Sequence, residues 1–161
     1  MRMSEGVEWA LHTCLNLSWV ESGEAVPTAR LAEFYGLPAA YLNKQLQALA
    51  RAGILSSTTG PRGGFRLARS PEKVTLLDVV TAIEGAEEAF RCDQILRHGP
   101  GGRQDVDYRQ ACVISQGMRK AELAWRTELA AQSLADIRAT VERRQPSAPG
   151  QARSRLAAGA A

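Results

Sequence analysis

The chain has 161 residues, 45% of them hydrophobic, which suits one domain with an appendage. A net charge of +3 permits nucleic-acid binding without establishing it, so the position of the charges has to decide. The three cysteines are an odd number and no apolar leader precedes them, which disfavours structural disulfides and favours a reducing cytoplasm. No apolar run approaches the roughly 20 residues that a membrane helix needs, so we expect no membrane partner.

The N-terminal part of the chain predicts a helix-turn-helix. Apolar residues at helical spacing from Val7 onward indicate an amphipathic first helix. A short second helix follows, with Thr28 as its expected N-cap and Gly36 at its end. Pro38 suits the first position of a third helix that ends at Gly53. Two short helices around a glycine-containing turn are typical of this DNA-binding motif.

The next segment predicts the wing that completes such a domain. Residues 54–57 and 65–67 have the composition of short strands, and the glycine-rich stretch between them can form a hairpin loop. Thr75-Leu76-Leu77-Asp78 then fits a capping box that opens a helix ending at Gly85. We therefore expect a winged domain over residues 1–85.

Beyond the winged domain the pattern changes twice. Residues 86–111 read as an irregular loop that contains Cys92 and ends before Cys112, and loops of this length are usually functional or disordered. Residues 112–142 contain a long helix whose apolar face a monomer of this size has no core to bury, so it predicts a dimerisation helix. Residues 143–161 have the composition of a disordered tail. The expected fold is mainly α with a small β-wing.

Four side chains form a candidate metal-binding set. Cys92 and Cys112 supply two thiolates, and Glu8 and His12 lie one turn apart on one face of the first helix. A [2Fe–2S] cluster needs four protein ligands, and imidazoles can replace thiolates in some of them. The same four residues suit zinc. The ordinary alternative is an exposed Glu8–His12 pair and two buried cysteines.

The remaining residues offer few further candidates for metal binding or catalysis. Cys14 lies on the apolar stripe of the first helix and is expected in the core, whereas His98 in the loop is a substitute ligand for His12. No Ser/His/Asp set, phosphate loop or dinucleotide fingerprint occurs, and the two histidines offer little acid–base machinery. We therefore expect no enzyme.

The third helix and the wing supply the candidate DNA contacts. A helix in the major groove presents its N-terminal half to base edges, where Asn43 and Gln47 can pair with adenine and Lys44 can reach guanine or phosphate. A helix N-terminus and a glycine hairpin suit contacts with phosphate. The candidates are Thr28, Ala39, Ala40, Tyr41, Asn43, Lys44, Gln47, Arg62, Gly63 and Gly64.

Three motifs, within residues 41–55, 62–69 and 75–85, together resemble the Rrf-two family of bacterial winged-helix regulators, which includes the IscR- and NsrR-type sensors. The resemblance extends from residue 1 to about residue 141. It implies a homodimer that binds palindromic double-stranded operators and, in many members, holds an iron–sulfur cluster. Most members use three closely spaced cysteines for the cluster, whereas this chain has Cys92 and Cys112, farther apart.

A redox-sensing branch, the RsrR type, is similar in having two cysteines supported by a Glu and a His of the first helix, and Glu8-Trp9-Ala10-Leu11-His12 matches that arrangement. The resemblance implies Glu8, His12, Cys92 and Cys112 as ligands drawn from two chains. Trp9 becomes a candidate for redox-coupled repacking, and its alternative is ordinary packing at the dimer interface. The implied function is a regulator that senses redox state or nitric oxide through a [2Fe–2S] cluster; the alternative is a zinc-bound or metal-free regulator without redox sensing.

Overall fold

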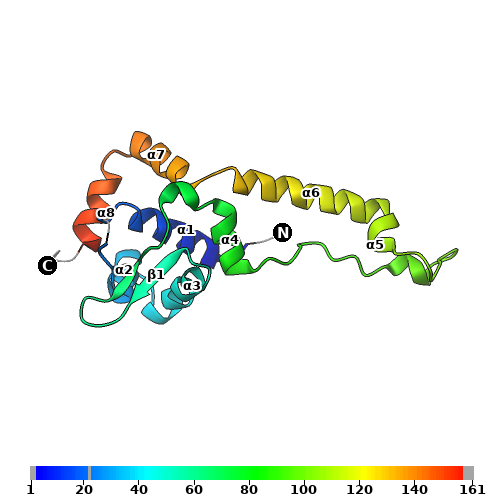
Figure 1. Ribbon diagram of the computed structural model, residues 1–161, viewed down its shortest axis with the longest axis horizontal. Coiled ribbons are helices and arrows are strands. Elements are labelled where there is room, and N and C mark those ends of the chain that lie inside the picture. The colour runs from blue at the N-terminus through cyan, green and yellow to red at the C-terminus, as the bar shows by residue number, and fades with distance from the viewer. Residues whose placement is uncertain (1–2, 22, 158–161) are drawn as a thin grey trace.

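The structure is a computed structural model that describes residues 3–21 and 23–157. It consists of a compact body and a long arm (Figure 1). The elements in chain order are α1 (Glu5–Leu17), α2 (Thr28–Tyr35), α3 (Ala39–Arg51), β1 (Leu55–Thr58), β2 (Gly64–Leu67), η1 (Pro71–Lys73), α4 (Leu76–Glu84), η2 (Ile95–His98), α5 (Tyr108–Ala111), α6 (Val113–Ala130), α7 (Leu134–Arg144) and α8 (Ala148–Leu156). The predicted fold class, mainly α with a small β-wing, is confirmed.

The core lies between the helices of the body. Leu31 of α2 and Leu42, Leu46 and Leu49 of α3 are completely buried, together with Cys14 of α1. Burying each leucine contributes roughly 1.5–3 kcal/mol relative to leaving it exposed. The apolar faces predicted for these three helices are therefore what holds the body together.

The turn between α2 and α3 forms as predicted, with two differences at the helix starts. Gly36 has φ 66°, and this left-handed conformation, which glycine adopts at little cost, ends α2. Thr28 is the first residue of α2 and Pro27 is its N-cap, so the predicted capping role of Thr28 is wrong. Pro38 likewise precedes α3 as its N-cap, and the helix begins at Ala39.

The wing is a two-stranded antiparallel hairpin. Its register pairs Leu55 with Leu67 and Thr58 with Gly64. Val26, just before α2, adds a further antiparallel bridge to Phe65, with both backbone hydrogen bonds at 2.9 Å. The wing is thus attached directly to the start of the helix-turn-helix.

The predicted capping box at Thr75 forms, and a second capping box, at Ser133, lies against it. Thr75 and Asp78 cap α4, while Ser133 and Asp136 cap α7. The two N-cap residues pair as an antiparallel bridge, with Leu134 N donating to the Val74 carbonyl at 2.7 Å. This junction joins the end of α6 to the body.

The predicted disordered tail is wrong for most of its length. Residues 148–156 form α8, whose Ala152 and Leu156 are each only 1% exposed against the body. The Arg30 guanidinium of α2 donates to the carbonyl oxygens of Leu156 and Ala157, so the orphan groups at the end of α8 gain a partner. The segment has few apolar residues, but Ala148, Ala152 and Leu156 fall on one helical face and pack against the core. The end of the predicted tail, 158–161, lies outside the described residues.

The arm comprises residues 86–130, with α6 along one side and the cysteine-bearing loop along the other (Figure 1). Arg126 of α6 donates to the carbonyl oxygens of Ala86 and Glu87 at 3.1 and 3.3 Å and fixes the base of the arm. Of its apolar side chains, Ile114 is 70% and Leu123 66% exposed. Within the part of the chain that the structure describes, no helix has the length and apolarity to cross a membrane.

Candidate functional site

The predicted DNA-reading residues lie on the outer face of α3. Leu42, Leu46 and Leu49 point into the core, and helical periodicity turns the intervening residues outward. The candidates Ala39, Ala40, Tyr41, Lys44 and Gln47 are exposed, and Asn43 is partly exposed. The Tyr41 side chain is 37% exposed. The helix therefore offers an accessible polar surface to a groove.

In the wing, two of the candidate residues have a structural reason to be glycine. A Cβ on Gly63 would lie 2.4 Å from the Thr58 carbonyl oxygen, and one on Gly64 would lie 2.3 Å from the Val26 backbone. Gly63 is thus required by close backbone approach within the hairpin, and Gly64 by the close approach of the segment before α2. Arg62 beside them is exposed and is the wing side chain best placed for phosphate. Thr28, at the start of α2, is partly buried.

The structure brings the two loop cysteines to one backbone carbonyl. Cys92 Sγ lies 3.9 Å from the Tyr108 carbonyl oxygen, and the Cys112 backbone N–H donates to the same oxygen at 3.0 Å. Both side chains are partly exposed, and neither forms a disulfide. A cavity of about 620 Å³ opens beside Cys92. The Cys92 thiol and the Cys112 backbone, far apart in sequence, therefore lie at one carbonyl oxygen, an approach that joint ligation of a soft metal by the two cysteines requires.

The other two predicted ligands lie in the body. Val7, Ala10 and Cys14 turn one face of α1 into the core, so Glu8 and His12 are exposed on the opposite face. Figure 1 shows α5 and the start of α6 at the far end of the arm from α1. Over residues 3–21 and 23–157, no three His, Cys, Asp or Glu side chains gather as a metal site. One chain therefore presents the predicted ligands as two separate halves.

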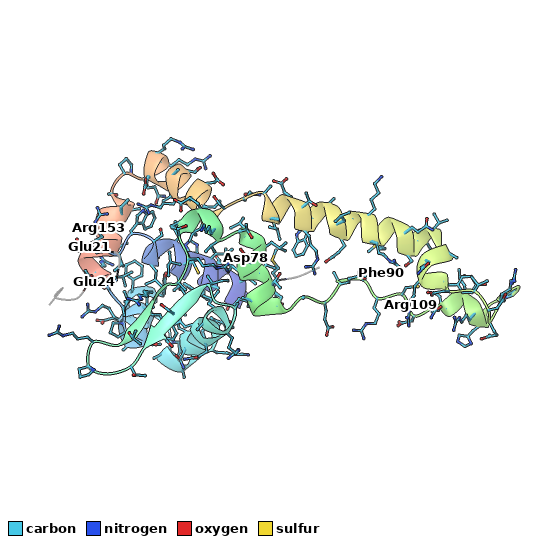
Figure 2. The ribbon with its side chains drawn as sticks, in the orientation of Figure 1. Glu21, Glu24, Asp78, Phe90, Arg109 and Arg153 are labelled. Carbon is cyan, nitrogen blue, oxygen red and sulfur yellow. The ribbon has the colours of Figure 1, made fainter. Side chains whose placement is uncertain are left out.

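Labelled side chains show that the cysteines lie on the arm and not in the body. Figure 2 shows Phe90 and Arg109 along the arm, and Asp78 in the body. Phe90 precedes Cys92 by two residues and Arg109 precedes Cys112 by three, so both thiols belong to the arm.

The weaker metal candidates remain outside either half. Cys14 is completely buried, and burial raises the pKa of its thiol to about 12, opposed in part by the charge of Arg69. The thiolate is therefore scarce at neutral pH, as expected for a core cysteine. His98 ends η2 and is exposed on the loop.

Trp9 contacts the helix-turn-helix of its own chain. Its ring lies 5.3 Å from the ring of Tyr35 at 58°, and the Tyr35 hydroxyl accepts a hydrogen bond from Asn16 Nδ2 at 2.7 Å. A Cβ on Gly6 would lie 2.9 Å from Gln45 Oε1, so α1 also approaches α3 closely. The helix that carries Glu8 and His12 thus touches both helices of the DNA-reading motif. Sequence reasoning missed Tyr35 and Gln45 because these contacts join distant segments.

Relatives were found both by sequence and by structure. YwgB of Bacillus subtilis, described as an HTH-type transcriptional regulator, is 28% identical over 138 residues, covering 85% of this chain and 84% of its own. The HTH-type regulator IscR of Escherichia coli K12 is 28% identical over 107 residues, 66% of this chain and 63% of its own.

Among solved structures, IscR of T. potens is similar with a TM-score of 0.65 and 21% identity, over 90% of this chain and 91% of its own. The global cysteine regulator CymR of B. subtilis gives a TM-score of 0.61 with 17% identity, over 87% and 98% of the two chains. At these identities the likeness shows a shared fold.

The Rrf2 family, described as iron-dependent transcriptional regulators, matches residues 3–140. The chain therefore belongs to the Rrf2 family and is a DNA-binding transcriptional regulator rather than an enzyme.

Proposed function

We propose that this regulator works as a homodimer that reads a palindromic operator and senses redox state through a [2Fe–2S] cluster. In this proposal Cys92 and Cys112 of one chain hold the cluster together with Glu8 and His12 of the other. The observation that carries it is the meeting of Cys92 and Cys112 at the Tyr108 carbonyl, on an arm that extends away from the exposed Glu8 and His12.

The exposed face of α6 supports the dimer. Ile114 and Met118, one turn apart on the same face, are 70 and 42% exposed, and exposed apolar side chains that lie together typically mark a protein interface. Between α4 and α6 lies a cavity of about 360 Å³ lined by Met3, Val80, Phe90 and Trp125 among others. A second chain on this side would bury both surfaces and bring its own α1 toward the cysteines.

The chemistry of the donors supports an iron–sulfur cluster. Two thiolates, an imidazole and a carboxylate complete the four protein ligands that a [2Fe–2S] cluster needs, and a bound cluster would supply one-electron redox chemistry. The family description, iron-dependent transcriptional regulator, agrees with iron. Zinc fits the same donors and is the alternative, in a regulator without redox sensing.

The route from the cluster to DNA would run through α1. A bound cluster would be held to α1 by Glu8 and His12, so a change in the cluster would act on this helix. Any shift of α1 reaches α2 through Trp9 and Tyr35, and reaches α3 through Gly6 and Gln45. The two recognition helices of the dimer would then change their spacing, which is a two-state element biased by a local event.

Anaerobic purification followed by operator titration tests the proposal. We expect a coloured protein with visible absorption, and iron and sulfide in equal amounts. Affinities of the oxidised and reduced forms, measured at one salt concentration with the absorption intact, should differ by about 5- to 150-fold. A colourless protein containing zinc would establish the alternative, and equal affinities would show that oxidation state is not the signal.

A further inference from the structure

Gln94 has an unusual backbone for its residue type. Its φ of 54° and ψ of 37° place it in the left-handed region, and among the described residues it is the single non-glycine with a positive φ. This conformation costs free energy for a side chain with a Cβ, and such outliers persist where surrounding contacts impose them. Gln94 follows Cys92 by two residues, so the strain lies beside a predicted ligand.

The Gln94 side chain bonds to Tyr108, the residue whose carbonyl contacts both cysteines. Its Oε1 accepts a hydrogen bond from the Tyr108 backbone N–H at 3.2 Å. The carbonyl of the same residue, Tyr108, receives the Cys112 N–H at 3.0 Å and lies 3.9 Å from Cys92 Sγ. Tyr108 is further fixed by its hydroxyl, which accepts from Arg103 N at 3.0 Å. Every polar group of Tyr108 is therefore engaged.

Other hydrogen bonds of the loop shape its outer turn. Arg97 donates to the Val106 carbonyl at 3.1 and 3.3 Å, and Gln104 Nε2 donates to the Arg97 carbonyl at 3.3 Å. These bonds do not involve Tyr108 or a cysteine. Gln104 is thus a matched comparison for Gln94, since it is a glutamine of the same loop whose side chain also bonds to backbone.

We propose that Gln94 and Tyr108 form a clasp that holds the Cys92 thiol close to the backbone of Cys112, within reach of a shared metal, before any metal binds. Both are positioning residues. Without the clasp, metal binding would have to bring the two ends of the loop together. The entropy lost in closing the loop would then weaken metal binding. The inference rests on the proposed function for the use of these thiols, but it concerns the metal-free chain.

Phenylarsine oxide, a probe for paired thiols, tests the clasp on the metal-free protein under anaerobic conditions. The trivalent arsenic exchanges its oxygen for two As–S bonds, the two thiol protons leave with that oxygen as water, and no oxidation state changes. The wild-type chain should take up one probe, with Cys14 excluded by burial. Gln94→Ala should bind the probe about fivefold more weakly, the factor supplied by one ordinary hydrogen bond.

Three further variants make the test specific. Gln94→Glu keeps an acceptor oxygen and should restore binding, and Gln104→Ala should bind as the wild type does. Gln94→Gly fits the left-handed backbone but lacks the acceptor, so it should be as weak as Gln94→Ala. Thermal unfolding of the body serves as the folding control, because the loop lies on the arm.

The outcomes separate the clasp from the cluster. Wild-type binding by Gln94→Ala, or by Gln94→Gly, would overturn the clasp and leave the proposed function standing. A wild-type protein that captures the probe but never acquires a cluster would overturn the proposed function and leave the clasp standing. In a protein that does bind a cluster, Gln94→Ala should lose its visible absorption to a chelator faster than Gln94→Glu.

Discussion

In the body, Leu42 and Leu46 are completely buried, whereas in the arm Ile114 and Leu123 are 70 and 66% exposed. Over residues 86–130, all of them described, Ser115 is the one buried residue. The body thus buries its apolar residues within one chain, whereas the arm leaves Ile114 and Leu123 exposed. Helix periodicity is the same in both regions, so the difference lies in what each apolar face has to pack against.

Removing one leucine from each region tests whether the body and the arm differ in this way. Leu46→Ala should destabilise the chain by about 3 kcal/mol, because it leaves a cavity in a closed core. Leu123→Ala should change the stability by no more than about 0.5 kcal/mol, since its side chain is already in water. Denaturant unfolding at a protein concentration low enough to disfavour association measures both. Equal losses would mean that α6 packs within its own chain.

The C-terminal helix belongs to the body by the same criterion. Leu156→Ala should cost about 2 kcal/mol in denaturant unfolding, because the side chain is buried against the helix-turn-helix domain. Its neighbour Arg155 is exposed, and Arg155→Ala is the matched control with an expected change of about 0.5 kcal/mol or less. An unchanged stability in Leu156→Ala would mean that this segment does not pack against the body and is disordered, as its composition predicts.

The residues of the body that we propose to face DNA divide into two kinds. Arg62→Ala should weaken binding to every sequence and lower the salt dependence of log K by about one phosphate contact. Gln47→Ala should instead relax the preference at one base pair, by about 1–3 kcal/mol. Titrations of operator and scrambled DNA at several salt concentrations distinguish the two effects. A sequence-specific loss in Arg62→Ala would contradict its assignment to the backbone.

The smallest expected effect is on how Tm depends on pH. Hydrogen bonds from Arg138 and from Trp19 lower the pKa of Glu142, which joins α7 to the segment after α1. A lowered folded-state pKa gives stability that is present above the unfolded value and is lost as pH falls through the folded one. Glu142→Gln should therefore reduce the acid dependence of Tm. Asp105 in the arm has its pKa lowered by Arg103, two residues away, so Asp105→Asn should leave the Tm of the body unchanged at each pH.

Local rules explain which features could be predicted from the sequence. The helix end at Gly36 and the capping box at Thr75 depend on neighbours within a few residues, and both form as expected. The burial of Leu156 was missed because its partners lie in α1 and α2, far away in sequence. For the site, the types of the candidate ligand residues were predictable. The contact of Tyr108 with the two cysteines was not, because it is made by a backbone carbonyl, which every residue type has.

Mixing two differently damaged chains tests most directly whether the cluster is shared between subunits. One chain carries Cys92→Ala and Cys112→Ala, and the other carries Glu8→Ala and His12→Ala, so neither homodimer has a complete ligand set. Cluster reconstitution of the purified heterodimer should yield one intact site, seen as half the visible absorption of the wild-type dimer. A heterodimer that folds, binds operator DNA and acquires no cluster would show that the four residues do not act across the dimer.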